Sequence, residues 1–152
     1  MIKKIIELVS TVFYVGYLPI SGTMASLVGL LIYFLINKNN LLYTIVLAVI
    51  LILGFLVSGK AEKIFNQKDS RNIVIDEVSG MLIALFLLPV RLPIIIIAFF
   101  LFRAFDTIKP PPADRLQNLR GSAGVMLDDI FAAIYTNLII QLSLRITSVI
   151  TS

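Results

Sequence analysis

Acidic residues stand beside apolar segments of this 152-residue chain at three separate places. These are Asp76 with Glu77, Asp106, and Asp128 with Asp129. An ionised carboxylate close to hydrocarbon is costly unless it is paired, bound to a metal or hydrated, so acids kept there need a use. Clustered carboxylate oxygens suit a hard divalent cation such as Mg2+. The pattern predicts metal-dependent chemistry at a membrane surface.

Two basic residues flank one of these acids. Arg103 and Lys109 stand three residues on either side of Asp106, which places all three along one side of a helix end. Gly124 precedes Asp128 at the expected start of the last helix, where free N–H groups and the helix dipole favour negative charge. The sites together offer carboxylates for a metal and cations for a phosphate.

The residue types that are absent narrow the chemistry further. The chain has no Cys and no His, which excludes thiolate and imidazole nucleophiles and zinc sites built on them. Activation of water by a metal, or attack on phosphorus by a carboxylate, both stay open.

The composition favours lipid as the solvent. Hydrophobic residues make up 59% of the chain and charged residues 14%, whereas soluble domains average about 45–50% and about 25%. The net charge of +4 comes from basic residues scattered without a basic stripe. We therefore expect contact with anionic phospholipid head groups and no nucleic-acid partner.

Apolar periodicity predicts an all-α fold. Residues Ile2, Ile5, Ile6, Val9 and Phe13 recur at helical spacing, which indicates an amphipathic helix at the membrane interface that is retained in the mature chain. Longer apolar segments are expected at 24–36, 41–57, 73–88, 94–105 and 128–149, with a charged connector at 60–72 and a polar loop at 114–124. The prediction is a single membrane-embedded domain over residues 1–152. It forms a compact polytopic helical bundle with about four membrane-crossing helices.

The distribution of charge predicts the orientation. With the N-terminus in the cytoplasm, all but three of the 13 Lys and Arg residues fall on the inner side, the exceptions being Lys38, Arg91 and Arg145. Every acidic residue falls on the inner side as well. This favours a hairpin of 73–88 and 94–105 over one long span, and it predicts a multi-pass protein of the cytoplasmic (inner) membrane whose site faces the cytoplasm.

Structural roles for single residues are the alternative. Asp128 alone could be a helix cap, and Arg103 with Asp106 could be an ion pair near the interface. The agreement of three acidic sites on one face favours function over structure.

Ordered sequence blocks resemble those of a known family. Residues 22–27 (GTMASL), 73–80 (IVIDEVSG), 102–110 (FRAFDTIKP) and 124–129 (GVMLDD) are similar, in order and spacing, to blocks of the phosphatidylglycerophosphatase A family. Ala25 replaces a usual glycine of that family, and none of the departures removes a carboxylate or a cation.

The resemblance implies Mg2+-dependent hydrolysis of the phosphomonoester of phosphatidylglycerophosphate, and an all-helical fold around a central helix. It implies that metal ligation and general-base work fall to Asp76, Glu77, Asp106, Asp128 and Asp129. Arg103 and Lys109 are then expected to bind the phosphate and stabilise charge in the transition state. Thr23 and Ser26 are expected to contact phosphate near a helix N-terminus.

Two other classes of protein remain alternatives. One is a different membrane phosphoryl-transfer enzyme acting on a phospholipid head group, although the Asp-Gly…Asp…Asp motif of the CDP-alcohol phosphotransferases is missing. The other is a small non-enzymatic transporter, which should carry acids through the depth of the membrane, whereas the outer half of this chain has none.

Overall fold

A short buried helix, α4 (Ile75–Leu85), lies at the centre of the structure, a computed structural model that describes residues 1–151 and the side chains through residue 149. All but two of its residues are buried, including Asp76 and Ser79. It packs against α2 (Ser21–Ile36), α3 (Asn40–Phe65), α5 (Leu92–Ile108) and α7 (Ser122–Thr151). A helix that is apolar nearly all round is stable only when others cover it, and here four do.

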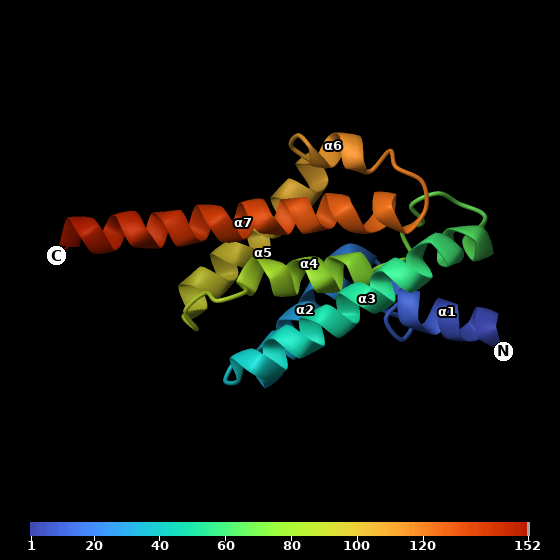
Figure 1. The fold of residues 1–152 in the computed structure, drawn as a ribbon, viewed down its shortest axis with the longest axis horizontal. Coiled ribbons are helices and arrows are strands. Elements are labelled where there is room, and N and C mark those ends of the chain that lie inside the picture. Colours follow the sequence, from blue (N-terminus) through green and yellow to red (C-terminus); the bar gives the residue numbers. More distant parts are fainter. Residues whose placement is uncertain (152) are drawn as a thin grey trace.

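The described chain is all-α, as predicted. The remaining elements are α1 (Ile2–Ser10), a 3-10 turn η1 (Val15–Tyr17) and the one-turn helix α6 (Ala113–Leu116). Figure 1 shows that the α2–α3 turn and the α4–α5 loop lie at one end of the bundle, whereas the last turns of α3 and the start of α7 lie at the other. The second half of α7 projects beyond the other helices (Figure 1).

Within the described part of the chain, two helices are long and apolar enough to cross a membrane. These are α3, with 26 residues, and α7, whose apolar segment covers Ser122–Val149. Among the described residues α2, with 16 residues, α5, with 17, and α4, with 11, fall short of that length. Membrane association is therefore indicated by two helices, and the expected number of about four crossings stays a prediction.

Two predicted helix ends were wrong. Helix α3 continues to Phe65, through the first half of the connector expected at 60–72. It does so because Ala61 is fully buried in an apolar cluster with Ile73 and Ile75, against which Ile6 and Val9 of α1 pack. Helix α7 begins at Ser122, whose Oγ accepts a hydrogen bond from the backbone N–H of Gly59 at 2.8 Å. Asp128 and Asp129 consequently lie in the second turn of α7, and neither caps the helix or meets its free N–H groups.

Candidate functional site

The first turn of α4 supplies two of the predicted acids. The segment before it is anchored to α1, because the backbone N–H of Val74 donates to the carbonyl of Ser10 at 2.9 Å. Asp76 is 6% exposed, and Glu77 beside it is partly buried. The N-terminal end of a helix is the position where the dipole favours carboxylates, which offsets part of the cost of burying them.

Helix α7 brings two more acids to the same place. Asp128 and Asp129 are each 3% exposed. One carboxylate oxygen from each of Asp76, Glu77 and Asp129 lies within 4.8 Å of the other two. Three carboxylates this close repel one another strongly unless a cation or protons intervene.

The unused oxygens of these carboxylates test whether a metal fits. Asp76 Oδ1, Glu77 Oε2, Asp128 Oδ1 and Asp129 Oδ2 are buried and have no hydrogen-bond partner among the described residues. Buried polar atoms are nearly always satisfied, so four orphaned oxygens in one place indicate a missing positive partner. An all-oxygen donor set of this kind fits a hard divalent cation.

The end of α5 supplies the two cations. Arg103 Nη1 donates to Asp106 Oδ2 at 2.6 Å. Lys109 ends the helix in a left-handed conformation, with φ of +49°, and its ammonium donates to Asp128 Oδ2 on α7 at 2.5 Å. Burial works to lower the pKa of the Lys109 ammonium, but the hydrogen bond and charge of Asp128, together with the charges of Asp69 and Asp129, raise it, so Lys109 stays protonated.

All five predicted acids and Lys109 line a cavity of about 200 Å3, whereas Arg103 does not line it and reaches it through its ion pair with Asp106. The other residues that line this cavity are Asp69, Ser70, Arg71 and Ile73. The turn between α4 and α5 thus brings Asp106 beside Asp76, which is the arrangement expected of the predicted hairpin. The roles of the individual residues stay predictions.

Gly22, in the first turn of α2, touches the site in a way that the sequence did not reveal. A Cβ atom at this position would lie 2.6 Å from Glu77 Oε1 and 2.9 Å from Arg103 Nη2. The backbone of α2 at Gly22 therefore lies in close contact with the side chains of Glu77, a predicted metal ligand, and Arg103, a predicted phosphate-binding cation. The signal available in the sequence was the position of Gly22 at the head of the first family block.

The two predicted hydroxyl contacts differ in the structure. Thr23 is partly buried in the first turn of α2, next to Gly22. Ser26 is fully buried, and its Oγ donates to the carbonyl of Gly22 at 2.9 Å. This geometry gives no support to Ser26 as a phosphate contact, because its hydroxyl is engaged within its own helix.

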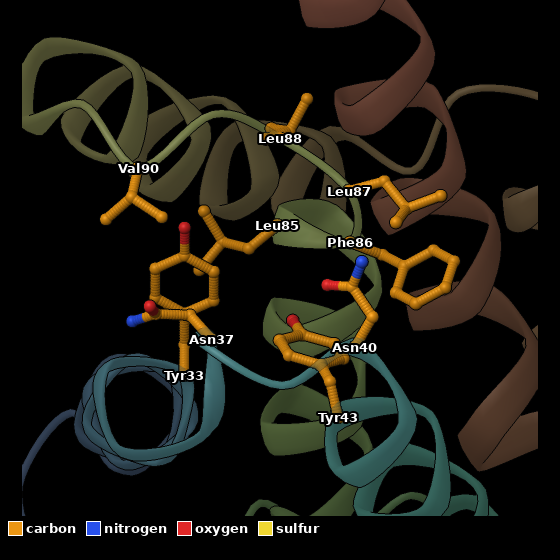
Figure 2. A pocket seen from close by; sticks show the side chains of 9 residues that line it. All are labelled: Tyr33, Asn37, Asn40, Tyr43, Leu85, Phe86, Leu87, Leu88 and Val90. Atoms are coloured by element: carbon orange, nitrogen blue, oxygen red, sulfur yellow. The ribbon is translucent and has the colours of Figure 1, made fainter.

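The opposite end of the bundle also has a cavity, but of different character. This pocket has a volume of about 40 Å3. Figure 2 shows the side chains that line it, none of them charged: Tyr33, Asn37, Asn40, Tyr43, Leu85, Phe86, Leu87, Leu88 and Val90. The hydroxyl of Tyr43 donates to the carbonyl of Leu82 at 2.6 Å. Neutral polar side chains around apolar residues give no acid, base or metal ligand for phosphate chemistry.

Comparison of the sequence with known proteins identifies a family of phosphatases. The sequence profile described as phosphatidylglycerophosphatase A matches residues 8–144. The chain belongs to the phosphatidylglycerophosphatase A family. The family membership that the sequence blocks predicted is therefore confirmed. The protein is a phosphatase of this family.

Three curated relatives cover most of this family member. A Bacteroides thetaiotaomicron protein named "Putative phosphatidylinositol-3-phosphatase" is 34% identical over 90% of this chain and 91% of its own length. The Haemophilus influenzae and Escherichia coli proteins named phosphatidylglycerophosphatase A are 34% and 33% identical, over 80% and 84% of this chain and 77% of their own lengths in each case. No solved structure matches this chain.

Proposed function

We propose that this phosphatidylglycerophosphatase A family member is a Mg2+-dependent lipid phosphatase that hydrolyses phosphatidylglycerophosphate to phosphatidylglycerol and inorganic phosphate. The observation that carries the proposal is the meeting of Asp76, Glu77 and Asp129 from two helices, with orphaned oxygens and with two cations beside them.

The contacts divide the five acids into two groups. Asp106 and Asp128 are already paired with Arg103 and Lys109, so we assign them to hold these cations in place. Asp76, Glu77 and Asp129 have no cationic partner within 4 Å among the described residues, and we assign them to hold Mg2+. When bound, Mg2+ supplies the positive charge that lets an anionic phosphate enter a cavity walled by carboxylates.

The chain's own residues account for the rest of the reaction. Arg103 and Lys109 donate to non-bridging phosphate oxygens, where negative charge is concentrated in the transition state of phosphoryl transfer. The oxygen of an entering water bonds to phosphorus, and a carboxylate of the cavity accepts a proton from this water. The bond between phosphorus and the glycerol oxygen breaks, this oxygen takes up a proton, and the products are the lipid alcohol and inorganic phosphate.

The names of the relatives leave two lipid substrates to compare. Phosphatidylglycerophosphate is proposed because the family profile and two of the three relatives carry that description. Phosphatidylinositol 3-phosphate is the second candidate, because the Bacteroides thetaiotaomicron relative, which matches over 90% of this chain, is named as a putative phosphatase of that lipid. Both present a phosphomonoester on the head group of an anionic lipid.

We also propose that the acidic cavity faces the cytoplasm from the inner membrane. The concentration of Lys and Arg at the cavity end supports this orientation. Asn39 precedes the first turn of α3 and Lys63 lies in its last turn, so they mark the two ends of this helix. A cysteine replacing Lys63 should be shielded from an impermeant external reagent and one replacing Asn39 should react. The opposite result would reverse the orientation.

Phosphate release in detergent tests the activity. Purified protein given phosphatidylglycerophosphate or phosphatidylinositol 3-phosphate should release phosphate with Mg2+ and stop on chelation. Mg2+ should also raise the thermal unfolding midpoint, because a ligand that binds only the folded state stabilises it, by about 2.7 kcal/mol at 100 times its Kd. Turnover that survives chelation would contradict the metal role. Faster turnover of phosphatidylinositol 3-phosphate than of phosphatidylglycerophosphate would make the inositol lipid the preferred substrate.

A further inference from the structure

A second cavity lies beside the acidic one and shares a wall with it. It has a volume of about 530 Å3 and is lined by Gly16, Tyr17, Leu18, Pro19, Ile20, Ser21, Arg71 and Asn72. Arg71 lines this cavity and the acidic cavity alike. The two cavities therefore meet at Arg71, and a ligand that occupied both would lie across its side chain.

Contacts between two distant segments build this second cavity. A Cβ atom on Gly16 would lie 2.0 Å from the carbonyl oxygen of Asn72, so the backbones touch there and only glycine fits. The hydroxyl of Ser21 donates to the carbonyl of Arg71 at 2.8 Å. The cavity is thus held open by the fold before any ligand binds, as in most ligand sites.

Arg71 is the cation of this cavity that is free to bind a ligand. The ion pairs within the described residues use Arg103 and Lys109, and Arg71 is exposed and has no carboxylate partner there. None of the other lining residues is charged. A guanidinium presents a planar set of N–H donors that matches two phosphate oxygens, so its chemistry favours a phosphate group.

Apolar side chains are exposed around the same segment. Ile20, which lines the cavity, is 76% exposed, Leu18 is 45% exposed, and nearby Phe13 is 77% exposed. Exposed apolar groups next to a cation are suited to the boundary between head groups and acyl chains. The second cavity therefore combines the guanidinium that it shares with the acidic cavity and exposed apolar side chains.

We propose that the second cavity binds the phosphodiester of the lipid substrate, with Arg71 contacting it and with Leu18 and Ile20 directed toward the acyl chains. The inference rests on the proposed lipid phosphatase activity and extends it. It holds for both candidate lipids, because each carries a phosphodiester between its head group and its diacylglycerol. Arg71 would then be a specificity residue that selects phospholipid monophosphates over simple phosphate esters.

Binding of a lipid without the scissile phosphate tests the site apart from catalysis. Short-chain phosphatidylglycerol keeps the phosphodiester and lacks the phosphomonoester, and short-chain diacylglycerol lacks both. The Kd of the wild-type protein for phosphatidylglycerol, measured by calorimetry in detergent, should rise about tenfold or more in Arg71→Gln and less in Arg71→Lys, since a charge-assisted contact is lost or weakened. Arg115→Gln, at an exposed arginine that lines neither cavity, should leave it unchanged. Equal binding by wild type and Arg71→Gln would overturn the proposal, as would equal binding of the two lipids by the wild type.

Kinetics with a matched pair of substrates provides the second test. Phosphatidylglycerophosphate contains both phosphates, whereas glycerol 3-phosphate contains only the phosphomonoester. Arg71→Gln should lower kcat/KM for the lipid about tenfold, through a higher KM, and lower kcat/KM for glycerol 3-phosphate by a clearly smaller factor. Equal losses on both substrates would show that Arg71 serves the scissile phosphate and would overturn the diester assignment. A wild-type protein that hydrolyses neither substrate would end the proposed function, and the binding measurement would still decide the second cavity.

Discussion

The two ends of α4 both bury polar groups, but of opposite kinds. At its N-terminal end the carboxylates of Asp76 and Glu77 have oxygens without partners. At its C-terminal end the last carbonyls receive donors from other helices, because Tyr43 donates to Leu82, and Asn137 Nδ2 donates to Ala84 at 3.0 Å and to Phe86 at 2.8 Å. One end is left with unmet acceptors, whereas the other has its acceptors filled.

This difference separates function from structure. The last carbonyls of any helix lack partners within it, so side chains that reach them simply complete the fold. Packing alone does not require three carboxylates within one small cavity, since the same volume filled with neutral groups would cost less. Unmet negative charge therefore marks the acidic cavity as the working end of α4, whereas the C-terminal end, beside Tyr33 and Tyr43, holds only neutral groups and is structural.

Removing one carboxylate from the acidic end should give the largest effect. Asp129→Asn keeps the shape of the side chain and removes its charge, so we expect phosphate release to fall by about 100-fold or more. Without Mg2+ the same variant should unfold at a higher temperature than the wild type, because like-charge repulsion among the buried acids is relieved.

The two readouts of Asp129→Asn must move in opposite directions. Activity is measured as phosphate release at saturating lipid, and stability as the thermal unfolding midpoint in detergent with a chelator. A loss of both would assign Asp129 to the fold, and activity close to that of the wild type would remove it from the site.

A matched pair of glycines in α2 sharpens the comparison. Gly22→Ala would place a Cβ atom 2.6 Å from Glu77 Oε1 and 2.9 Å from Arg103 Nη2, whereas Gly29→Ala would place one 2.9 Å from Met81 Cβ and from the carbonyl of Val78. We expect Gly22→Ala to lower kcat about tenfold or more through displacement of these two site groups. Gly29→Ala should instead destabilise the protein by about 1–3 kcal/mol through overpacking, with activity retained in the folded fraction.

Activity per folded molecule and the unfolding midpoint distinguish the two glycine variants. Alanine has the higher helix propensity in the interior of α2, where Gly29 lies, so a loss of stability in Gly29→Ala would report overpacking. If Gly22→Ala kept its activity and lost only stability, the contact of α2 with Glu77 and Arg103 would be packing and nothing more.

At the C-terminal end of α4, loss of the hydrogen bond from Tyr43 should affect stability alone. Tyr43→Phe removes the buried donor to the carbonyl of Leu82, and the N–H of Phe86, four residues further on, donates to the carbonyl of Ile83 instead. We expect a decrease of about 1–2 kcal/mol in the free energy of unfolding, with unchanged kcat and KM. Impaired kinetics in this variant would show that the far end of α4 is coupled to the acidic cavity.

The sequence predicted chemical types better than positions. The sequence predicted that Asp76, Asp106 and Asp129 share one site, and all three line the acidic cavity. This prediction succeeded because the family blocks and the common membrane side of the acids depend only on residue type and order. Helix ends were predicted less well, since the start of α7 depends on the contact of Ser122 with Gly59 in α3, which no local pattern reveals.

Tertiary contacts also explain what the sequence left out of the site. Gly22 matters because α2 crosses the first turn of α4 and the end of α5, and Arg71 matters because two cavities meet at it. In the sequence Arg71 belongs to a run of charges, Lys68 to Arg71, which is typical of a solvated loop. Its neighbours in space, 50 residues away at Ser21, could come only from the structure.

The smallest effect is expected from the second tyrosine of the same pocket. Tyr33 is 2% exposed, and its hydroxyl has no hydrogen-bond partner among the described residues, in contrast to that of Tyr43 in the same view (Figure 2). Tyr33→Phe removes a buried polar atom without orphaning a protein acceptor, so the free energy of unfolding should change by less than about 0.5 kcal/mol, with unchanged activity. Denaturant titrations of Tyr33→Phe and Tyr43→Phe, run side by side in the same detergent, measure the difference directly. Equal losses would mean that burial of the hydroxyl, and not its bond to the end of α4, sets the stability of this end of the bundle.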